Sequence, residues 1–129
     1  MYGGRPRDAG TAIYFLLTSD TFSALHRLRT DEIFHFYLGD PVEMLHLHPD
    51  GTGASLLLGS APHEGMRPQV VVPAGVWQGA RMAGEGRFAL MGCTVAPGFE
   101  FEDFELGSRE ALTREYPGFG ETIRALTRG

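Results

Sequence analysis

The sequence contains no lysine, so all 11 of its basic residues are arginine. Its 16 acidic residues give a formal net charge of -5, which argues against a nucleic-acid-binding surface, because such surfaces need clustered positive charge. A single cysteine, Cys93, cannot form an internal disulfide, so the sequence does not require an oxidising compartment. No apolar run approaches the roughly 18 residues of a membrane span, and residues 1–10 lack the apolar core of a signal peptide. We therefore predict a cytoplasmic protein with no nucleic-acid or membrane partner.

The length of 129 residues and the 43% hydrophobic content fit one domain with a substantial core. Residues 1–10 are rich in glycine, arginine and proline, and we predict a flexible leader there and a single domain over residues 11–129. The run at residues 11–18, T-A-I-Y-F-L-L-T, is apolar on both faces, which predicts a strand covered on both sides. One side would face the core and the other a partner, so this strand favours a homodimer.

The chain beyond residue 18 alternates short apolar stretches with turn signals about every ten residues. We expect strands at residues 22–27, 32–39, 42–48, 54–59, 69–72, 76–82 and 87–95. Residues 99–106 alternate aromatic and acidic side chains, as an edge strand or extended arm does. From Ser108 the period changes to that of a helix that ends at Pro117, and a second short helix follows at residues 120–127. This pattern predicts an all-β barrel or jelly roll with short C-terminal helices.

A spaced set of residues lies in the second and third expected strands. The spacing is His-x-Leu-x3-Glu-x6-Gly from His26 to Gly39, and Pro-x-Gly-x-x-Gln follows at residues 73–78. Because side chains alternate along a strand, we expect His26 and Leu28 to share one face, and Glu32 a face of the next strand. This spacing closely resembles the two signature motifs of the cupin superfamily, which have histidines where this chain has Leu28 and Gln78. The resemblance implies the cupin double-stranded β-helix, a jelly roll.

The resemblance also implies a metal site of three histidines and one glutamate, of which this chain keeps only His26 and Glu32. Two protein ligands are fewer than a divalent transition ion usually needs. Gln78 adds at most a weak amide oxygen, and Leu28 adds nothing. We therefore favour no cofactor, with a weak divalent metal held by His26, Glu32 and Gln78 as the alternative.

Four blocks of the sequence are similar to one branch of the cupins, the uncharacterised DUF985 or Cupin_5 family. They lie at residues 11–17, 31–41, 72–80 and 92–106, and the resemblance extends over residues 11–127. Leu28 and Gln78 are typical of that family. Its members usually carry a further segment before the first block. A lost strand there would expose a sheet edge, which we expect dimerisation or the leader to cover.

The residues of the two motifs are the candidate site. His26 and Glu32 either act together as general base and acid or form a structural hydrogen bond inside the barrel. Gln78 binds either a substrate oxygen or Glu32. Trp77 belongs either to the core or to a surface that stacks on a ligand. The predicted substrate-binding residues are Gln78, Trp77, Phe34 and Tyr37, although packing also explains Tyr37.

The other histidines have simpler interpretations. His35 has the opposite parity from Glu32, which favours a dimer interface or a satisfied core histidine. His46 and His48 form a His-x-His pair that is favoured to lie on the surface or at the rim. His63 lies in a polar loop and is expected to be solvated.

We also favour no catalytic role for the arginines and the cysteine. Four arginines either face solvent or flank the barrel mouth and bind an anion: Arg27, Arg67, Arg81 and Arg87. Cys93 lacks a neighbouring group that would activate its thiol and is expected to be buried and inert.

We predict a small-molecule site in the barrel. The favoured activity is a metal-independent isomerase or epimerase acting on a polar, carbohydrate-like substrate, by similarity to metal-free sugar-nucleotide epimerases of the same fold. One alternative is a small-ligand-binding module without turnover. The other is a weak-metal enzyme, such as a dioxygenase or lyase.

Overall fold

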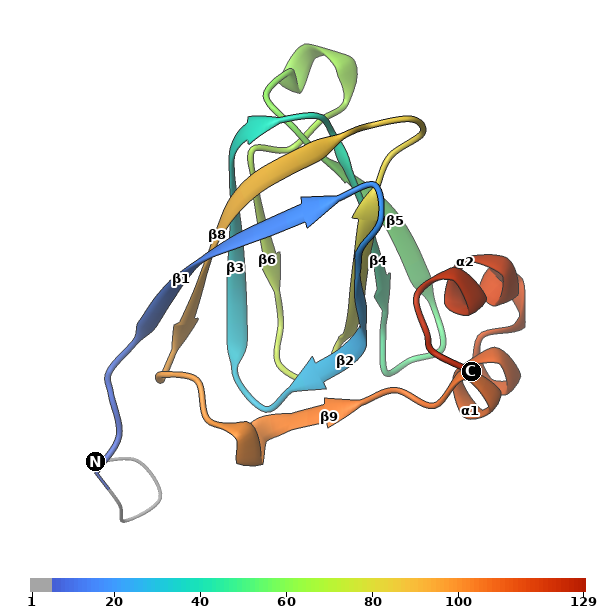
Figure 1. Cartoon of the computed structure of the whole chain (residues 1–129). Coiled ribbons are helices and arrows are strands. Elements are labelled where there is room, and N and C mark those ends of the chain that lie inside the picture. Colours follow the sequence, from blue (N-terminus) through green and yellow to red (C-terminus); the bar gives the residue numbers. More distant parts are fainter. Residues whose placement is uncertain (1–5) are drawn as a thin grey trace.

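The computed structural model describes residues 6–129, which form two antiparallel β-sheets that face each other (Figure 1). One sheet has the strand order β1-β8-β3-β6 and the other β5-β4-β7-β2-β9. The strands are β1 (Thr11–Thr18), β2 (Phe22–Leu28), β3 (Asp31–Gly39), β4 (Val42–Leu47), β5 (Gly53–Leu58), β6 (Gln69–Val72), β7 (Trp77–Met82), β8 (Phe88–Ala96) and β9 (Phe104–Leu106). The predicted all-β jelly roll with short C-terminal helices is confirmed.

The ends of strands β1 to β8 agree with the sequence prediction to within one residue. The predicted extended arm is different, because its middle forms a 3-10 helix, η2 (Phe101–Asp103), and only β9 is a strand. Two further 3-10 turns are η1 (Pro62–Glu64) and η3 (Pro117–Phe119). The helices are α1 (Arg109–Glu115) and α2 (Gly120–Ala125). As predicted, Ser108 caps α1, and its side chain accepts a hydrogen bond from the backbone N–H of Ala111.

The first hydrophobic core lies between the two sheets. Phe34, Met44 and Met91 contribute large side chains that are at most 2% exposed. Burying side chains of this size stabilises the fold by roughly 1.5 to 3 kcal/mol each. At the end of β3, Gly39 has φ 109°, a conformation that other residues rarely adopt.

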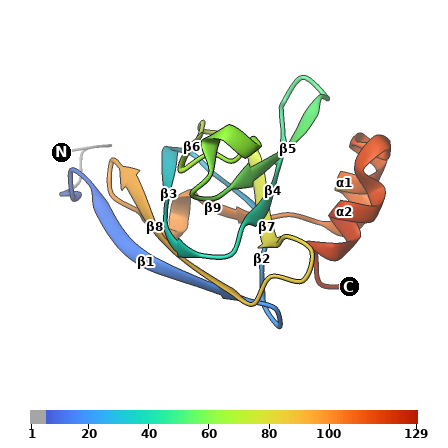
Figure 2. The ribbon, with the colours of Figure 1, turned by 90° about the horizontal axis from the view of Figure 1, so that it is seen from above.

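A second core lies between the outer face of the five-stranded sheet and the C-terminal helices. Leu45 and Trp77 come from the sheet, and Leu112 and Ile123 come from α1 and α2. Figure 2 shows both helices on the side of the molecule away from β1. No helix formed by residues 6–129 has the length and apolar character that a membrane crossing needs.

The outer face of the four-stranded sheet is not covered by these helices. It exposes Tyr14 (78%), Leu16 (58%) and Tyr37 (53%), and the rings of Tyr14 and Tyr37 meet edge to face at 6.2 Å. Strand β1 lies at the edge of this sheet, and only Leu17 in it is fully buried. The expected cover on both sides of β1 is therefore absent from the described part of a single chain.

Candidate functional site

A cavity of about 300 Å³ lies between the sheets, with β1, β3 and β8 on one side and β2 on the other. Its lining is mostly apolar, and its titratable groups are two of the motif residues and the cysteine. The lining residues are Thr11, Ile13, Phe15, His26, Glu32, Phe34, Cys93, Val95 and Phe99. Apolar walls with a few convergent polar groups are typical of small-molecule sites.

Glu32 is the buried carboxyl group of this cavity, with 8% of its surface exposed. Its Oε1 accepts a hydrogen bond from Nε2 of Gln78 at 2.8 Å, and the Cys93 thiol also hydrogen-bonds to it. Burial raises the pKa of Glu32, and the bonds from Gln78 and Cys93 oppose this rise. Of the two roles considered for Gln78, the structure shows the bond to Glu32.

Cys93 is buried, at 2% exposure. Burial is the main reason that the pKa of its thiol is raised, and the neighbouring Glu32 charge adds to it. A thiol that resists ionisation is a poor nucleophile, so the structure agrees with the inert cysteine predicted from the sequence.

His26 reaches the cavity through a β-bulge. The register of β2 against β7 shifts between Ser23 and His26, and His26 then lies directly opposite Gln78. Its Nδ1 lies 2.7 Å from the backbone oxygen of Ala24. Because a carbonyl oxygen can only accept, Nδ1 carries the proton and Nε2 keeps its lone pair.

The surroundings of His26 favour its neutral form. Burial lowers the pKa of His26, and the bond to Ala24 offsets part of the effect. The ring also stacks on Phe104, with centroids 5.1 Å apart. A neutral imidazole with a free Nε2 is a base in its working form near pH 7.

His26 and Glu32 come from opposite sheets and line the same cavity, as the sequence analysis required. The structural alternative was a direct hydrogen bond between His26 and Glu32. The described chain does not show it: His26 bonds to Ala24, and Glu32 accepts a hydrogen bond from Gln78. The two groups therefore face a shared space that a ligand can enter.

The ligands of a divalent metal are not assembled here. Nε2 of His26 and the Glu32 carboxyl group are the two strong donors, the Gln78 amide nitrogen donates to Glu32, and Leu28 offers no donor. Among residues 6–129, no three His, Cys, Asp or Glu side chains are grouped in a way that could hold a metal. The donor set does not fit the metal that the cupin motifs imply.

Of the four predicted substrate-binding residues, Phe34 lines the cavity, Gln78 bonds to Glu32 behind it, and Trp77 and Tyr37 lie away from it. Trp77 precedes Gln78, so alternation turns it to the outer face of β7, where it joins the second core and the Arg27 guanidinium lies 4.4 Å from its ring. Tyr37 is on the outer face of β3, because the inner positions end at Phe36 before a second register shift. Trp77 and Tyr37 therefore do not face the cavity, which corrects the expectation that they bind a ligand inside the barrel.

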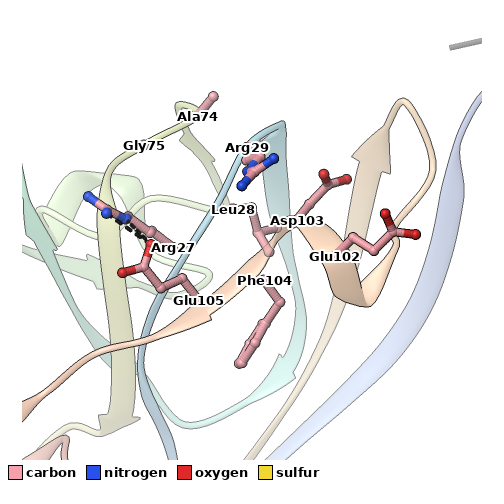
Figure 3. Close-up of a pocket in the computed structure, with 9 residues that line it drawn as sticks. All are labelled: Arg27, Leu28, Arg29, Ala74, Gly75, Glu102, Asp103, Phe104 and Glu105. Atoms are coloured by element: carbon pink, nitrogen blue, oxygen red, sulfur yellow. Dashed lines mark hydrogen bonds and ion pairs between the residues drawn. The ribbon is translucent and has the colours of Figure 1, made fainter. Parts of the chain in front are cut away.

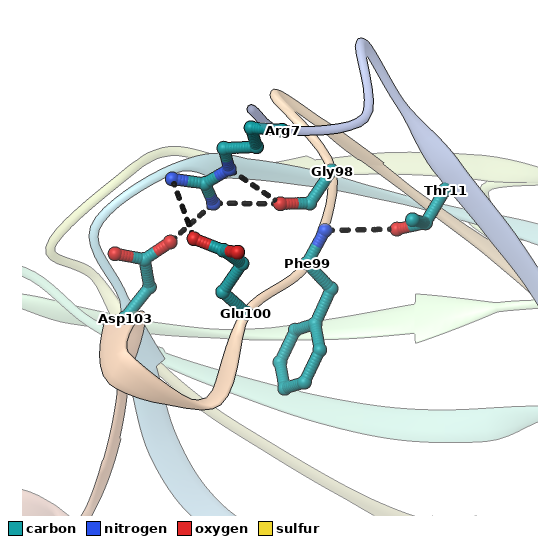
Figure 4. Close-up of polar contacts among 6 residues, drawn as sticks. All are labelled: Arg7, Thr11, Gly98, Phe99, Glu100 and Asp103. Atoms are coloured by element: carbon teal, nitrogen blue, oxygen red, sulfur yellow. Dashed lines mark hydrogen bonds and ion pairs between the residues drawn. The ribbon is translucent and has the colours of Figure 1, made fainter. Parts of the chain in front are cut away.

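One wall of the cavity depends on contacts that the sequence analysis missed (Figure 4). The backbone N–H of Phe99 donates to Oγ1 of Thr11 at 3.0 Å. Arg7 donates to the backbone oxygen of Gly98 and pairs with Asp103. These contacts hold Phe99 beside the cavity, and they join residues about 90 positions apart, so no local sequence signal could have revealed them.

Arg7 also belongs to the predicted flexible leader. Its side chain is 10% exposed, so the described part of the leader is attached to the domain at this residue. Residues 1–5 of the predicted leader lie outside the described residues.

A separate groove lies where β9 meets the end of β2 (Figure 3). Arg27 pairs there with Glu105 at 2.9 Å, and Arg29 lines the same groove. Elsewhere Arg81 pairs with Glu43 at 2.8 Å. Arg27 and Arg81 thus have protein carboxylates as partners and do not flank the barrel cavity.

The remaining histidines occupy three environments. His35, half-buried on the outer face of β3, bonds to Thr94 at 3.1 Å, as a satisfied histidine does. His63 is exposed, as expected. The prediction that His46 and His48 lie on the surface or at the rim is wrong for His46, which is 4% exposed and lies opposite Gln78 on the inner face of β4. His48 is half-buried. Only the strand register reveals the inward position of His46.

The facing sheets, the helical cover of one of them and the His–Glu cavity define a cupin-type β-barrel protein. The chain belongs to the Cupin_5 family, described as the cupin superfamily (DUF985), whose family profile matches residues 2–107.

Three similar proteins carry names that state no activity. The uncharacterized protein YML079W of Saccharomyces cerevisiae is 31% identical over 100 residues, 75% of this chain, which spans about half the length of that relative. The structure of protein SO0799 from Shewanella oneidensis shares 38% identity at a TM-score of 0.90, covering 99% of this chain and 80% of that one. A hypothetical protein from Leishmania major shares 30% identity at a TM-score of 0.88, and the match covers 100% of this chain and 82% of that one.

The more distant structural neighbours include enzymes. A dTDP sugar isomerase from Desulfovibrio desulfuricans matches at a TM-score of 0.67 and 16% identity, covering 86% of this chain and 72% of that one. At this identity the likeness shows the fold alone.

Proposed function

We propose that the cavity beside His26 and Glu32 binds a small molecule, and that His26 transfers a proton there, as in a metal-independent isomerase or epimerase. The observation that carries this proposal is the pairing of groups across one cavity. A neutral imidazole with a free Nε2 lies on one sheet and a carboxyl group of raised pKa on the other.

Epimerisation next to a carbonyl needs a base on one face of the substrate and an acid on the other. Nε2 of His26 takes the proton from the carbon, and the electron pair of the broken C–H bond forms an enolate. Protonated Glu32 then returns a proton to the opposite face. Exchange with solvent removes the proton from His26 and restores the one on Glu32. The raised pKa of Glu32 makes its acid form easier to populate near neutral pH.

The lining also bears on the substrate. Phe15, Phe34 and Phe99 present aromatic surface to the cavity, against which a sugar ring can pack. A volume of about 300 Å³ is at the small end of the range for ligand sites. It favours a substrate whose reacting part is about the size of a monosaccharide. The carbohydrate-like class also draws on the fold shared with the dTDP sugar isomerase, an argument from fold alone.

The proposal is tested by incubating the protein in D₂O with a panel of 4-keto sugar nucleotides and following the carbon next to the carbonyl by NMR. Wild type should incorporate deuterium, and His26→Gln should lower the rate by about 10²- to 10⁴-fold while binding persists. His63→Gln is the matched control, because His63 is an exposed loop histidine, and its rate should equal that of wild type.

A second candidate is a ligand-binding module without turnover, which the mostly apolar lining favours. Tight binding of a panel member by wild type with no deuterium incorporation would select it. Stoichiometric bound metal in purified protein, lost in Glu32→Gln, would instead select the weak-metal enzyme.

We also propose a homodimer formed through β1. Tyr14, Leu16 and Tyr37 expose apolar surface on the outer face of the four-stranded sheet, and among residues 6–129 no strand pairs with the outer edge of β1. A second copy that packs there would remove this surface from water. No helix of the described chain covers this face, whereas α1 and α2 cover the other sheet.

A further inference from the structure

A second cavity, of about 510 Å³, lies on the other side of the molecule from β1 and β2. It is lined by His46, His48, Ala54, Leu56, Arg67, Gln69, Val70 and Val71, none of which lines the first cavity. Strands β5 and β6 are edge strands of different sheets, and an isolated bridge joins Leu58 of β5 to Arg67, which precedes β6. The cavity therefore occupies the gap where the two sheets do not join.

The charged groups of this cavity are all basic. Its lining includes the buried His46 and the exposed Arg67, and the ring centroids of His46 and His48 are 6.3 Å apart. No carboxylate is among the lining residues. In the described chain the Arg67 guanidinium has no ion-pair partner, unlike those of Arg27 and Arg81. A concave surface with one sign of charge concentrates ions of the other sign.

His46 adds a polar ring to the cavity without adding a full charge. Burial, followed by the charges of His48 and Arg67, lowers the pKa of His46 to about 4. The ring is therefore neutral at pH 7 and carries one N–H. Its Nε2 lies 3.2 Å from Sδ of Met44, and sulfur is a weak hydrogen-bond partner.

We propose that this second cavity binds the oxyanion group, a carboxylate or phosphate, of a small metabolite. Arg67 holds the oxyanion, since its planar fork matches both groups, and His48 lies beside it. Leu56 and Val70 contact the apolar part of the ligand. The proposal is independent of the activity assigned to His26 and Glu32, because the two cavities have separate linings.

Isothermal titration at pH 7 and low salt with hexanoate, inorganic phosphate and hexylammonium tests this site. At least one anion should bind and the cation should not, and the histidine NMR signals of His46 and His48 should shift while that of His26 stays. Hexanoate in preference to phosphate would assign the site to an organic acid, and the reverse to a phosphorylated ligand.

Arg67→Gln should weaken anion binding about ten-fold, because it removes a charge-assisted bidentate contact. The substitution leaves the backbone bonds of Arg67 to Leu57 and Gly59 in place, and an unchanged thermal unfolding midpoint verifies the fold. Arg87→Gln removes an equally exposed arginine that lies outside the cavity and should leave binding unchanged. Failure of both anions to bind, equal binding of hexylammonium, or equal affinity in Arg67→Gln would overturn the proposal.

Discussion

The buried imidazole of His46 couples the stability of the domain to pH. In the folded protein its pKa is about 4, whereas an unfolded histidine has a pKa near 6.5. Between these values the unfolded chain binds a proton that the folded chain does not. Stability therefore rises with pH through this window and is lost as the pH falls from about 6.5 to 4.

The size of this loss follows from the two pKa values. The difference between 6.5 and about 4, at about 1.4 kcal/mol per pH unit, corresponds to about 3 kcal/mol. His46 is 4% exposed but lines a cavity that is open to solvent, so water screens part of the effect and about 3 kcal/mol is its upper value. A small domain has only about 5 to 15 kcal/mol of stability in total, so this single group accounts for a large part of the sensitivity to acid. Arg67 and His48, the basic groups that face His46, act in the same direction.

His46→Leu isolates this effect, because leucine fills much of the same space and does not titrate. The quantity to follow is the free energy of unfolding of wild type minus that of the variant. We expect this difference to decrease by up to about 3 kcal/mol when the pH is lowered from 7 to 4, because only wild type carries the titrating His46. Burial also lowers the pKa of His26, but that contribution is common to both proteins and cancels. Urea unfolding followed by the fluorescence of Trp77, the single tryptophan, measures the difference. A difference that stays constant with pH would refute the reasoning.

Three further predictions concern other parts of the molecule. Gln78→Leu removes the amide donor to Glu32 and should cost about 1 to 3 kcal/mol in urea unfolding; a change below about 0.5 kcal/mol would show that the bond is not needed. Gly39→Ala places a Cβ against the Phe88 backbone oxygen at φ 109°, so thermal unfolding should show a loss of at least about 1 kcal/mol, and an unchanged midpoint would contradict this. Tyr14→Glu should convert the proposed dimer to monomer in light scattering, whereas a monomeric wild type would exclude the dimer.

The elements of this fold were predictable because their signals are local. Strands β1 to β8 show apolar stretches bounded by glycine, proline and aspartate, and Ser108 marks the start of α1. The spacing from His26 to Gln78 placed a histidine and a carboxyl group inside one barrel. Both are there: Glu32 follows the regular alternation of β3, whereas His26 reaches the cavity because of the bulge in β2.

The site required knowledge that no local pattern contains. The bulge in β2 and the pairing of His26 with Gln78 depend on which strands become neighbours. The same is true of His46, whose inward position follows from its register with Gln78. The contact between Arg7 and Gly98 joins the two ends of the sheet-forming region.

The sequence by itself determined the jelly roll, the order of its strands along the chain and the pair of residues on which the proposed chemistry rests, because alternation and turn formation act over a few neighbouring residues. The tertiary structure decided that Gln78 bonds to Glu32, that Trp77 and Tyr37 turn outward, and that His46 faces a second cavity. The physical reason is that register and burial are set by the packing of distant strands, where a shift of one residue reverses the face on which every side chain lies.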